Sequence, residues 1–167
     1  MDLVTPYKRL ATPSDLEDGV GEQIAKAINP IIADALALYV KTKNYHWHLA
    51  GPHFRDYHLM FDEQAAEILA VVDPLAERVR KVGGTTLRSV GHIAQLQQVK
   101  DDDRDFVESR DMLLELMNEN KEVAARMRAA HAVTSDVNDV ATTSLLEEYI
   151  DQTEERTWFL FEAAQEA

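Results

Sequence analysis

The sequence predicts an all-α protein, a four-helix bundle with a short extra helix in the connection between the second and third helices. Apolar residues recur every three or four positions over nearly the whole chain, and no segment shows the alternation typical of a half-buried strand. Gly and Pro, which end or begin helices, gather in short stretches between four long periodic segments. Long helices joined by short turns, with one longer connection, fit a bundle with a crossover.

The first predicted helix begins at Ser14 or Gly21 and ends at His48, with apolar residues at steps of three and four along it. Pro30 leaves two alternatives open within this segment. It either kinks the helix or starts it, with Asn29 as the N-cap.

The second predicted helix follows an Ala-Gly-Pro break at 50–52 and runs from Pro52 or Phe54 to Val82. Pro74 lies inside this helix. Because proline has no backbone N–H to donate to the preceding turn, it should bend the helix at this point.

The connection after the second helix begins with a glycine pair at 83–84 and is polar, with room for one short helix around 92–98. The acidic run Asp101–Asp103 is well placed to cap a third helix over about 104–131. Phe106 is expected on the inner side of that helix.

The last predicted helix runs from about Asp139 to Ala164, with Ser135, Asp136 or Asp139 as its N-cap. The side chains expected to face the core are Leu145, Leu146, Tyr149, Trp158 and Phe161.

Length and composition indicate one globular domain. The chain has 167 residues, of which 46% are apolar and 28% charged, enough for one well-packed core. We therefore expect a single domain over 1–167, with about 1–20 as an N-terminal tail. Cysteine is absent, which excludes disulfides, thiol catalysis and thiolate ligands, so any metal must bind to His, Asp or Glu.

Charge and hydropathy limit the partners. The 17 basic and 30 acidic residues give a formal charge of −13, which repels nucleic acid and anionic membranes and attracts cations. The first ten residues, MDLVTPYKRL, do not resemble a secretory signal, and no stretch approaches the roughly 20 apolar residues of a membrane span. These features predict a cytoplasmic protein.

The stretch KNYHWHLAGPHFRDYHLMFDE at 43–63 holds four of the six histidines, at positions 46, 48, 53 and 58. On a helical wheel with His58 as origin, Asp62 falls at about 40°. Asp73 falls at about 60° and Glu77 at about 100°, so all four lie on one stripe of the second helix. His58 with Asp62, and Asp73 with Glu77, are i, i+4 pairs, and each pair can contact one ion.

These two pairs cannot share an ion within one chain. Asp62 and Asp73 are separated by about 16 Å along a helix axis, whereas a metal–ligand bond is about 2 Å long. Either the pairs are unrelated, or two copies pack this helix antiparallel about a two-fold axis. In the second case the first pair of one copy meets the second pair of the other, and one dimer holds two equivalent sites.

The first helix can add a ligand, because a tight turn joins its end to the second helix. His46 and His48 point about 200° apart on a helix, so at most one reaches the ion, and spacing alone leaves the choice open. Imidazole and carboxylate ligands together suit Fe(II), Zn(II) or Mn(II). Structural roles remain as alternatives, since a histidine at a helix end often bonds a carbonyl and a surface acid often pairs with Arg or Lys.

Other sites are disfavoured. The chain has no phosphate-binding or dinucleotide-binding glycine motif and no H-E-x-x-H. It also has no Glu-x-x-His, which disfavours a di-iron centre inside one bundle.

The histidine-rich stretch, followed by DPLAERVRKVGG and TLRSVGHI, strongly resembles the Dps family, the ferritin-like DNA-binding proteins from starved cells. The likeness is dense from about Leu36 to Ile93. It implies a ferritin-like bundle with a metal site at a dimer interface, and it selects His46 over His48. The implied ligands are His46, His58 and Asp62 of one subunit with Asp73 and Glu77 of the other. The resemblance also places Trp47 beside the site, where it would intercept oxidising equivalents.

The same resemblance implies a ferroxidase that oxidises Fe(II), preferably with hydrogen peroxide, and stores the Fe(III) mineral in a hollow shell of twelve subunits. Such a protein protects against oxidative stress, and zinc is a candidate competitor for its ligands. Iron would enter through acidic pores near the start of the last helix. The candidate pore residues are Asp136, Asp139, Glu147 and Glu148. Helix capping accounts equally well for the first two.

The chain departs from the family pattern in three respects, of which Pro74 inside the second helix is one. The family's DNA binding relies on a basic tail, but here the N-terminus offers only Lys8 and Arg9, and the C-terminus reads FEAAQEA. Twelve subunits at −13 each would carry −156, so we expect weak DNA binding or none. His48 and His53 are surplus to the pattern, and are either structural or bind a further ion such as zinc.

The main hypothesis is therefore an iron-oxidising and iron-storing shell. A second hypothesis is a DNA-organising shell with secondary iron chemistry. A third is a structural helical bundle without a metal, for which a monomer or small oligomer is expected.

Overall fold

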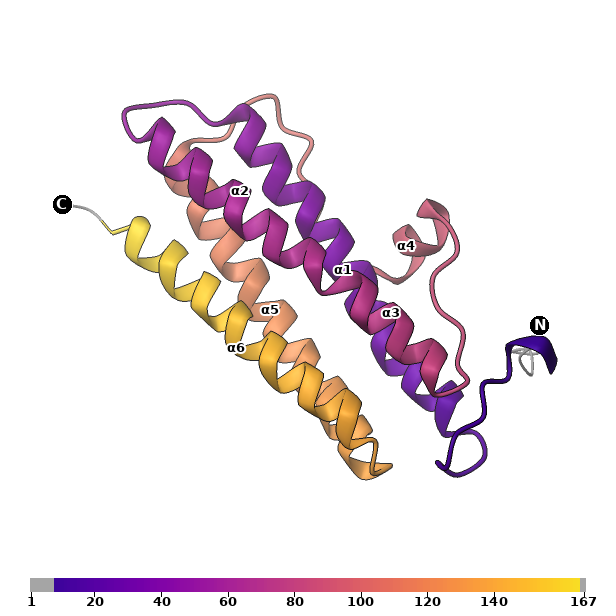
Figure 1. The fold of residues 1–167 in the computed structure, drawn as a ribbon. Helices are drawn as coiled ribbons and strands as arrows, with labels where there is room; N and C mark the ends of the chain where they lie inside the picture. The colour runs from indigo at the N-terminus through magenta and orange to yellow at the C-terminus, as the bar shows by residue number, and fades with distance from the viewer. Residues whose placement is uncertain (1–7, 166–167) are drawn as a thin grey trace.

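The structure is a computed structural model that describes residues 8–165, all of them helical or irregular with no strand. Two antiparallel helix layers make up the bundle, α1 beside α2 and α3, and α5 beside α6 (Figure 1). The α1–α2 turn and the α5–α6 turn lie at opposite ends of the bundle, and the short α4 projects from its side (Figure 1). The elements are η1 (Lys8–Leu10), α1 (Val20–His48), α2 (Phe54–Ala70), α3 (Val72–Lys81), α4 (Val90–Leu96), α5 (Ser109–Asp136) and α6 (Val140–Ala163). The predicted bundle is confirmed.

None of the helices in the described part of the chain is long and apolar enough to cross a membrane. Many apolar side chains face the interior of the bundle, and the largest that are completely buried come from both helix layers. They include Ile24, Ile28, Tyr45, Phe61, Leu75, Leu113, Leu116 and Leu146.

Helix α1 begins at Val20, after Gly19, whose φ of 87° lies in the left-handed region that favours glycine. The helix continues through Pro30, so this proline does not start it. Of the two alternatives that the sequence left open, a start at Pro30 is therefore wrong, and a kink there stays a prediction.

The second predicted helix is two helices in the structure, α2 and α3, with Val71 between them. Pro74 accounts for the interruption, because it has no N–H to donate to the carbonyl of Ala70. Leu75 and Val79 of α3 are completely buried. Asp73 therefore stands on a separate ten-residue helix, whose orientation depends on its own packing contacts.

The predicted capping of the third long helix is wrong. Helix α5 begins at Ser109, later than expected, and its N-cap Glu108 makes no side-chain cap bond. The carboxylate of Asp102 is engaged elsewhere, since it accepts a 2.6 Å hydrogen bond from Tyr45 Oη and a 2.7 Å one from Arg104. This long-range contact holds the acidic run away from the helix end.

Three aromatic core predictions also fail, because these side chains lie off the buried face of the bundle. Phe106 lies before α5 and is 58% exposed, while the neighbouring Val107 is buried. Trp158 is 60% exposed. On the α6 wheel it lies about 120° from the buried Leu146, which takes it off the core stripe. Phe161 is exposed as well.

Two other helices begin at a side-chain cap, and one of these caps, Asp139, is among the three predicted for the last helix. Ser89 begins α4 and accepts a hydrogen bond from His92 N at 3.1 Å. Asp139 begins α6 and accepts one from Thr142 N at 3.2 Å. A polar side chain that satisfies a free N–H of the first turn stabilises both helix starts.

Two glycines allow the backbone at the end of α3 to contact the backbone at the start of α1. A Cβ on Gly21 would lie 2.1 Å from the carbonyl oxygen of Val82, and one on Gly84 would lie 2.6 Å from the carbonyl oxygen of Gly21. Backbone atoms cannot swing aside as a flexible side chain can, so this crossing requires glycine.

Gly21→Ala should therefore lower the melting temperature by about 5–10 °C, on the order of 2–3 kcal/mol, because the helices must separate to admit the methyl group. Thermal unfolding followed by circular dichroism measures the effect. Gly91→Ala is the matched control, since its nearest neighbouring atom, Ser89 Oγ, is 3.9 Å away. Equal melting temperatures for the two variants would show that the close crossing is absent in solution.

Candidate metal centre

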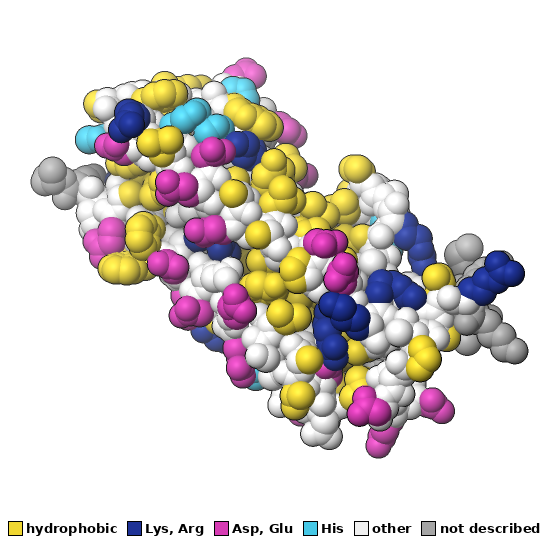
Figure 2. Space-filling view, in the orientation of Figure 1, with side chains coloured by type: hydrophobic (Ala, Val, Ile, Leu, Met, Phe, Trp, Pro, Cys, Tyr) yellow, Lys and Arg dark blue, Asp and Glu magenta, His cyan; other side chains and the backbone are white. Residues whose placement is uncertain are grey.

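The α1–α2 turn brings two of the predicted ligands into contact. His46 lies in the last turn of α1 and His58 in the second turn of α2. The reversal between them includes Gly51, whose φ of 117° is in the region that favours glycine. The two imidazole rings stack with 3.7 Å between their centroids and 19° between their planes. Histidine side chains gather visibly over this end of the bundle (Figure 2).

Each imidazole is held by the backbone of the other histidine. His46 Nδ1 lies 2.8 Å from the carbonyl oxygen of His58, and His58 Nδ1 lies 3.0 Å from that of His46. A carbonyl oxygen can only accept, so each Nδ1 carries the proton and donates it. In the neutral rings each Nε2 then keeps a free lone pair. Histidines that bind metals commonly have this arrangement, with one ring nitrogen donating a hydrogen bond and the other facing the metal. The carbonyl contact that sequence alone allowed as a purely structural role is thus compatible with metal binding.

An aromatic side chain that the sequence analysis missed supports this pair. The ring of Phe54 stacks on that of His58, with 4.9 Å between centroids. The signal was present, because Phe54 precedes His58 by one helical turn and such residues share a face. His46, at the other end of this stack, is buried.

Asp62 lies close to the histidine pair and is held by a lysine from α1. Its Oδ1 accepts a 2.6 Å hydrogen bond from Lys43 Nζ, which also lies 6.0 Å from the ring centroid of the exposed Trp47. The Lys43 hydrogen bond and charge lower the pKa of the Asp62 carboxyl, and the two imidazoles contribute smaller effects in the same direction. A cation bound by Asp62 must therefore compete with the Lys43 ammonium.

Asp73 and Glu77 lie on α3, away from the histidines of the same chain. Both are exposed, and Glu77 Oε2 pairs with Lys81 Nζ at 3.3 Å. Within residues 8–165 no three His, Asp or Glu side chains converge closely enough to hold a metal ion. One chain thus presents two separate, solvent-accessible sets of potential ligands.

The surplus histidines are exposed and make their own local contacts. His48 Nδ1 lies 2.9 Å from the carbonyl oxygen of Asn44, and the ring of His53 lies at a tilt, 5.5 Å from that of Tyr57. Neither contact involves the stacked pair.

Exposed apolar side chains lie on the same helices as the potential ligands. Figure 2 shows hydrophobic surface interspersed with acidic side chains along the bundle. Large apolar groups beside polar ones are typical of a protein–protein interface. Those of α1 and α2 are Val40, Trp47, Phe54, Leu59 and Leu69.

The interior of the bundle, in the part of the chain that the structure describes, contains a buried arginine. Arg156 is buried, donates to Asn120 Oδ1 at 3.1 Å and to Thr153 Oγ1 at 2.7 Å, and lies 3.4 Å from Glu67. A buried guanidinium repels a second cation. This agrees with the lack of Glu-x-x-His and argues against a metal centre inside one bundle.

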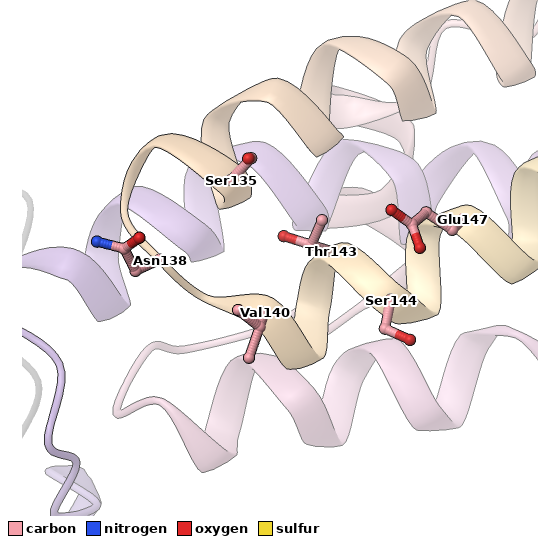
Figure 3. Close-up of a pocket in the computed structure, with 6 residues that line it drawn as sticks. All are labelled: Ser135, Asn138, Val140, Thr143, Ser144 and Glu147. Atoms are coloured by element: carbon pink, nitrogen blue, oxygen red, sulfur yellow. The ribbon is translucent and has the colours of Figure 1, made fainter.

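The candidate pore residues surround the start of α6. A surface pocket of about 300 Å³ lies there, lined from the end of α5, the turn and the first turns of α6 (Figure 3). Glu147 lines it and also pairs with His131 Nε2 at 3.1 Å, while Asp136 and Glu148 are exposed. Asp139 is buried and caps α6, so the capping alternative is the one observed for this residue.

Comparison with known proteins shows the family to which the fold belongs. The sequence pattern of the ferritin-like domain matches residues 25–166. A DNA protection during starvation protein from Halobacterium salinarum is 31% identical over 134 residues, covering 80% of this chain and 74% of the relative. DNA protection during starvation protein 1 from Deinococcus radiodurans is 28% identical, covering 87% of this chain and 70% of the relative. The solved structure of DpsC from Streptomyces coelicolor superposes with a TM-score of 0.89 at 28% identity, covering 93% and 91% of the two chains.

Proposed function

Because this chain belongs to the Dps group of the ferritin-like family, we propose that it is a ferroxidase that stores iron in a shell of its own subunits. Fe(II) is the substrate, hydrogen peroxide is the preferred oxidant over oxygen, and the Fe(III) product is kept as mineral. The proposed ligands are His46, His58 and Asp62 of one subunit with Asp73 and Glu77 of the partner subunit.

The stacked histidine pair is the observation that carries this proposal. With both Nδ1 atoms on carbonyl oxygens, both Nε2 lone pairs are available without reorganisation of the rings. Nitrogen and carboxylate ligands suit Fe(II), and carboxylates also stabilise the harder Fe(III) product. Zn(II) would compete for the same ligands.

A split site also accounts for the exposed acids of α3. The antiparallel pairing of two chains would bring Asp73 and Glu77 of the partner subunit to His58, and the exposed apolar side chains of α1 and α2 would be buried in the same step. Twelve subunits in a closed shell, with uptake of Fe(II) past acidic side chains such as Glu147, complete the proposal.

The proposed chemistry removes Fe(II) and peroxide together. Peroxide takes up two electrons as it is reduced to water, so two Fe(II) ions that each give one electron consume it without a free hydroxyl radical. Holding Fe(II) on protein ligands near Trp47 would keep stray oxidising equivalents within the protein. Protection against oxidative stress follows from this consumption.

The test is to load the protein with Fe(II) without oxygen and then add either peroxide or air. We expect peroxide to act at least about tenfold faster, with about two Fe(II) oxidised per peroxide, and Zn(II) added beforehand to slow the reaction. Fe(III) absorbance gives the rate, and sizing chromatography gives the number of subunits. A small oligomer without accelerated oxidation would instead support the structural bundle.

The proposal does not include DNA condensation. A charge of −13 on each subunit opposes the phosphate backbone, and a gel shift at about 0.15 M salt is expected to show no complex. A complex at that salt would favour the DNA-organising shell. The cytoplasm remains the location predicted from the sequence.

A further inference from the structure

Arg78 follows Glu77 on α3, yet its side chain ends on a different helix. Arg78 Nη2 donates to Asp139 Oδ1 at 2.5 Å, and its Nε donates to Thr142 Oγ1 at 2.9 Å. The side chain of Arg78 is 19% exposed and that of Asp139 only 1%. Two bonds from one planar guanidinium restrict both distance and direction, which a single ammonium contact cannot do.

The acceptor of this contact is itself held firmly. Besides Arg78, the carboxylate of Asp139 accepts hydrogen bonds from the backbone N–H and the hydroxyl of Thr142. The same carboxylate caps α6 and receives the arginine. Arg78 is therefore attached to the first turn of α6, which α5 packs against along its length.

Helix α3 is short, so a polar contact to α6 adds to its few apolar ones. Val71 separates it from α2, and the interior apolar contacts of this short helix come mainly from Leu75 and Val79. In the part of the chain that the structure describes, the side-chain hydrogen bonds that join α3 to the start of α6 both come from Arg78. These bonds act together with the packing of Leu75 and Val79, and they tie α3 to the side of the bundle that α6 forms.

We propose that Arg78 is a positioning residue for the metal centre, which fixes the direction in which Asp73 and Glu77 leave α3. On a helix, Glu77 points about 100° and Asp73 about 140° away from Arg78. The hydrogen bonds of Arg78 to α6 therefore direct both carboxylates away from α6. The inference deepens the proposed function and rests on it, since it takes these two carboxylates as ligands. Arg78 itself contacts no metal.

The experiment titrates the assembled protein with Co(II), whose visible spectrum reports ligand number and geometry without any oxidation. Arg78→Met should weaken Co(II) binding about tenfold and alter the spectrum, as expected when a group that orients a ligand is lost. Arg78→Lys keeps the charge but not the two-point contact, and should fall between Arg78→Met and the wild type.

Arg126→Met is the matched control. Arg126 Nε lies 2.6 Å from Asp34 Oδ2, with side-chain exposures of 19% and 0%, so this ion pair resembles that of Arg78 in length and burial. This hydrogen bond joins α5 to α1 and does not involve α3. We expect a similar loss of thermal stability from both methionine variants, but wild-type Co(II) affinity and spectrum in Arg126→Met.

The outcomes are distinct. Equal Co(II) affinity and spectrum in Arg78→Met and Arg126→Met would overturn the positioning role while leaving the proposed function intact. Wild-type Co(II) binding that survives His46→Ala/His58→Ala would overturn the proposed function and this inference with it. Should Arg78→Met not assemble, Arg78→Lys and Thr142→Val decide, and wild-type affinity and spectra in both would overturn the inference.

Discussion

Replacing both His46 and His58 with alanine should slow the peroxide-driven oxidation of Fe(II) by at least about 100-fold. The two imidazoles are the only nitrogen ligands of the proposed centre, and loss even of a group that merely orients a ligand costs about 10- to 100-fold in metal affinity or activity. The measurement adds peroxide to protein that holds Fe(II) without oxygen, and follows the absorbance of Fe(III) in a stopped-flow instrument.

The matched control for this variant is His48→Ala/His53→Ala. It removes two histidines from the same turn, both of them exposed and outside the stacked pair. We expect its rate to stay within about twofold of the wild type, because its ligands and their carbonyl contacts are intact. An unchanged rate in His46→Ala/His58→Ala, in protein of wild-type oligomeric state, would contradict the assignment of these ligands.

Two inactive variants should restore activity when they share a dimer. One variant is His46→Ala/His58→Ala and the other is Asp73→Ala/Glu77→Ala. In a mixed dimer one site keeps all four of these ligands and the other keeps none. Random pairing makes half of the dimers mixed, so about a quarter of the wild-type number of sites should return. Co-expression with two affinity tags isolates the mixed shells for the same rate measurement.

A mixture of His46→Ala with His58→Ala chains provides the control for complementation. Both histidines of a site come from one chain, so every site of this mixture lacks one of them and activity should stay low. If the first mixture also stays inactive, while both parents form the wild-type oligomer, the two halves do not meet across subunits.

Much of the fold can be predicted from local patterns. The bounds of α1, α4 and α6 agree with those expected to within a few residues, because glycines, prolines and capping side chains act on their own neighbourhood. Pro74 likewise predicts a disturbed second helix, and the structure has α2 and α3 there. The Dps resemblance is confirmed by the family match and the structural neighbours.

Local patterns fail where a residue is held by a distant one. The sequence predicts Asp102 as a helix cap. In the structure its carboxylate instead accepts a hydrogen bond from Tyr45, which lies 57 positions earlier. From the sequence, Asp139 fits a pore residue and a helix cap equally well. In the structure its carboxylate accepts a hydrogen bond from Arg78, which lies 61 positions earlier. Trp158 and Phe161 read as core residues because hydrophobicity alone does not tell an interior face from an exposed one.

The sequence by itself determined the helical periodicity, the placement of His58, Asp62, Asp73 and Glu77 on one predicted helical stripe, and the exclusion of an ion shared by the two pairs within one chain, since the helix rise separates them by far more than a metal–ligand bond length. Only the tertiary structure decided how His46 and His58 hold each other, that Lys43 occupies Asp62, and that Arg78 anchors α3 on α6. Such contacts depend on the three-dimensional path of the chain between their partners, and no repeating spacing in the sequence encodes that path.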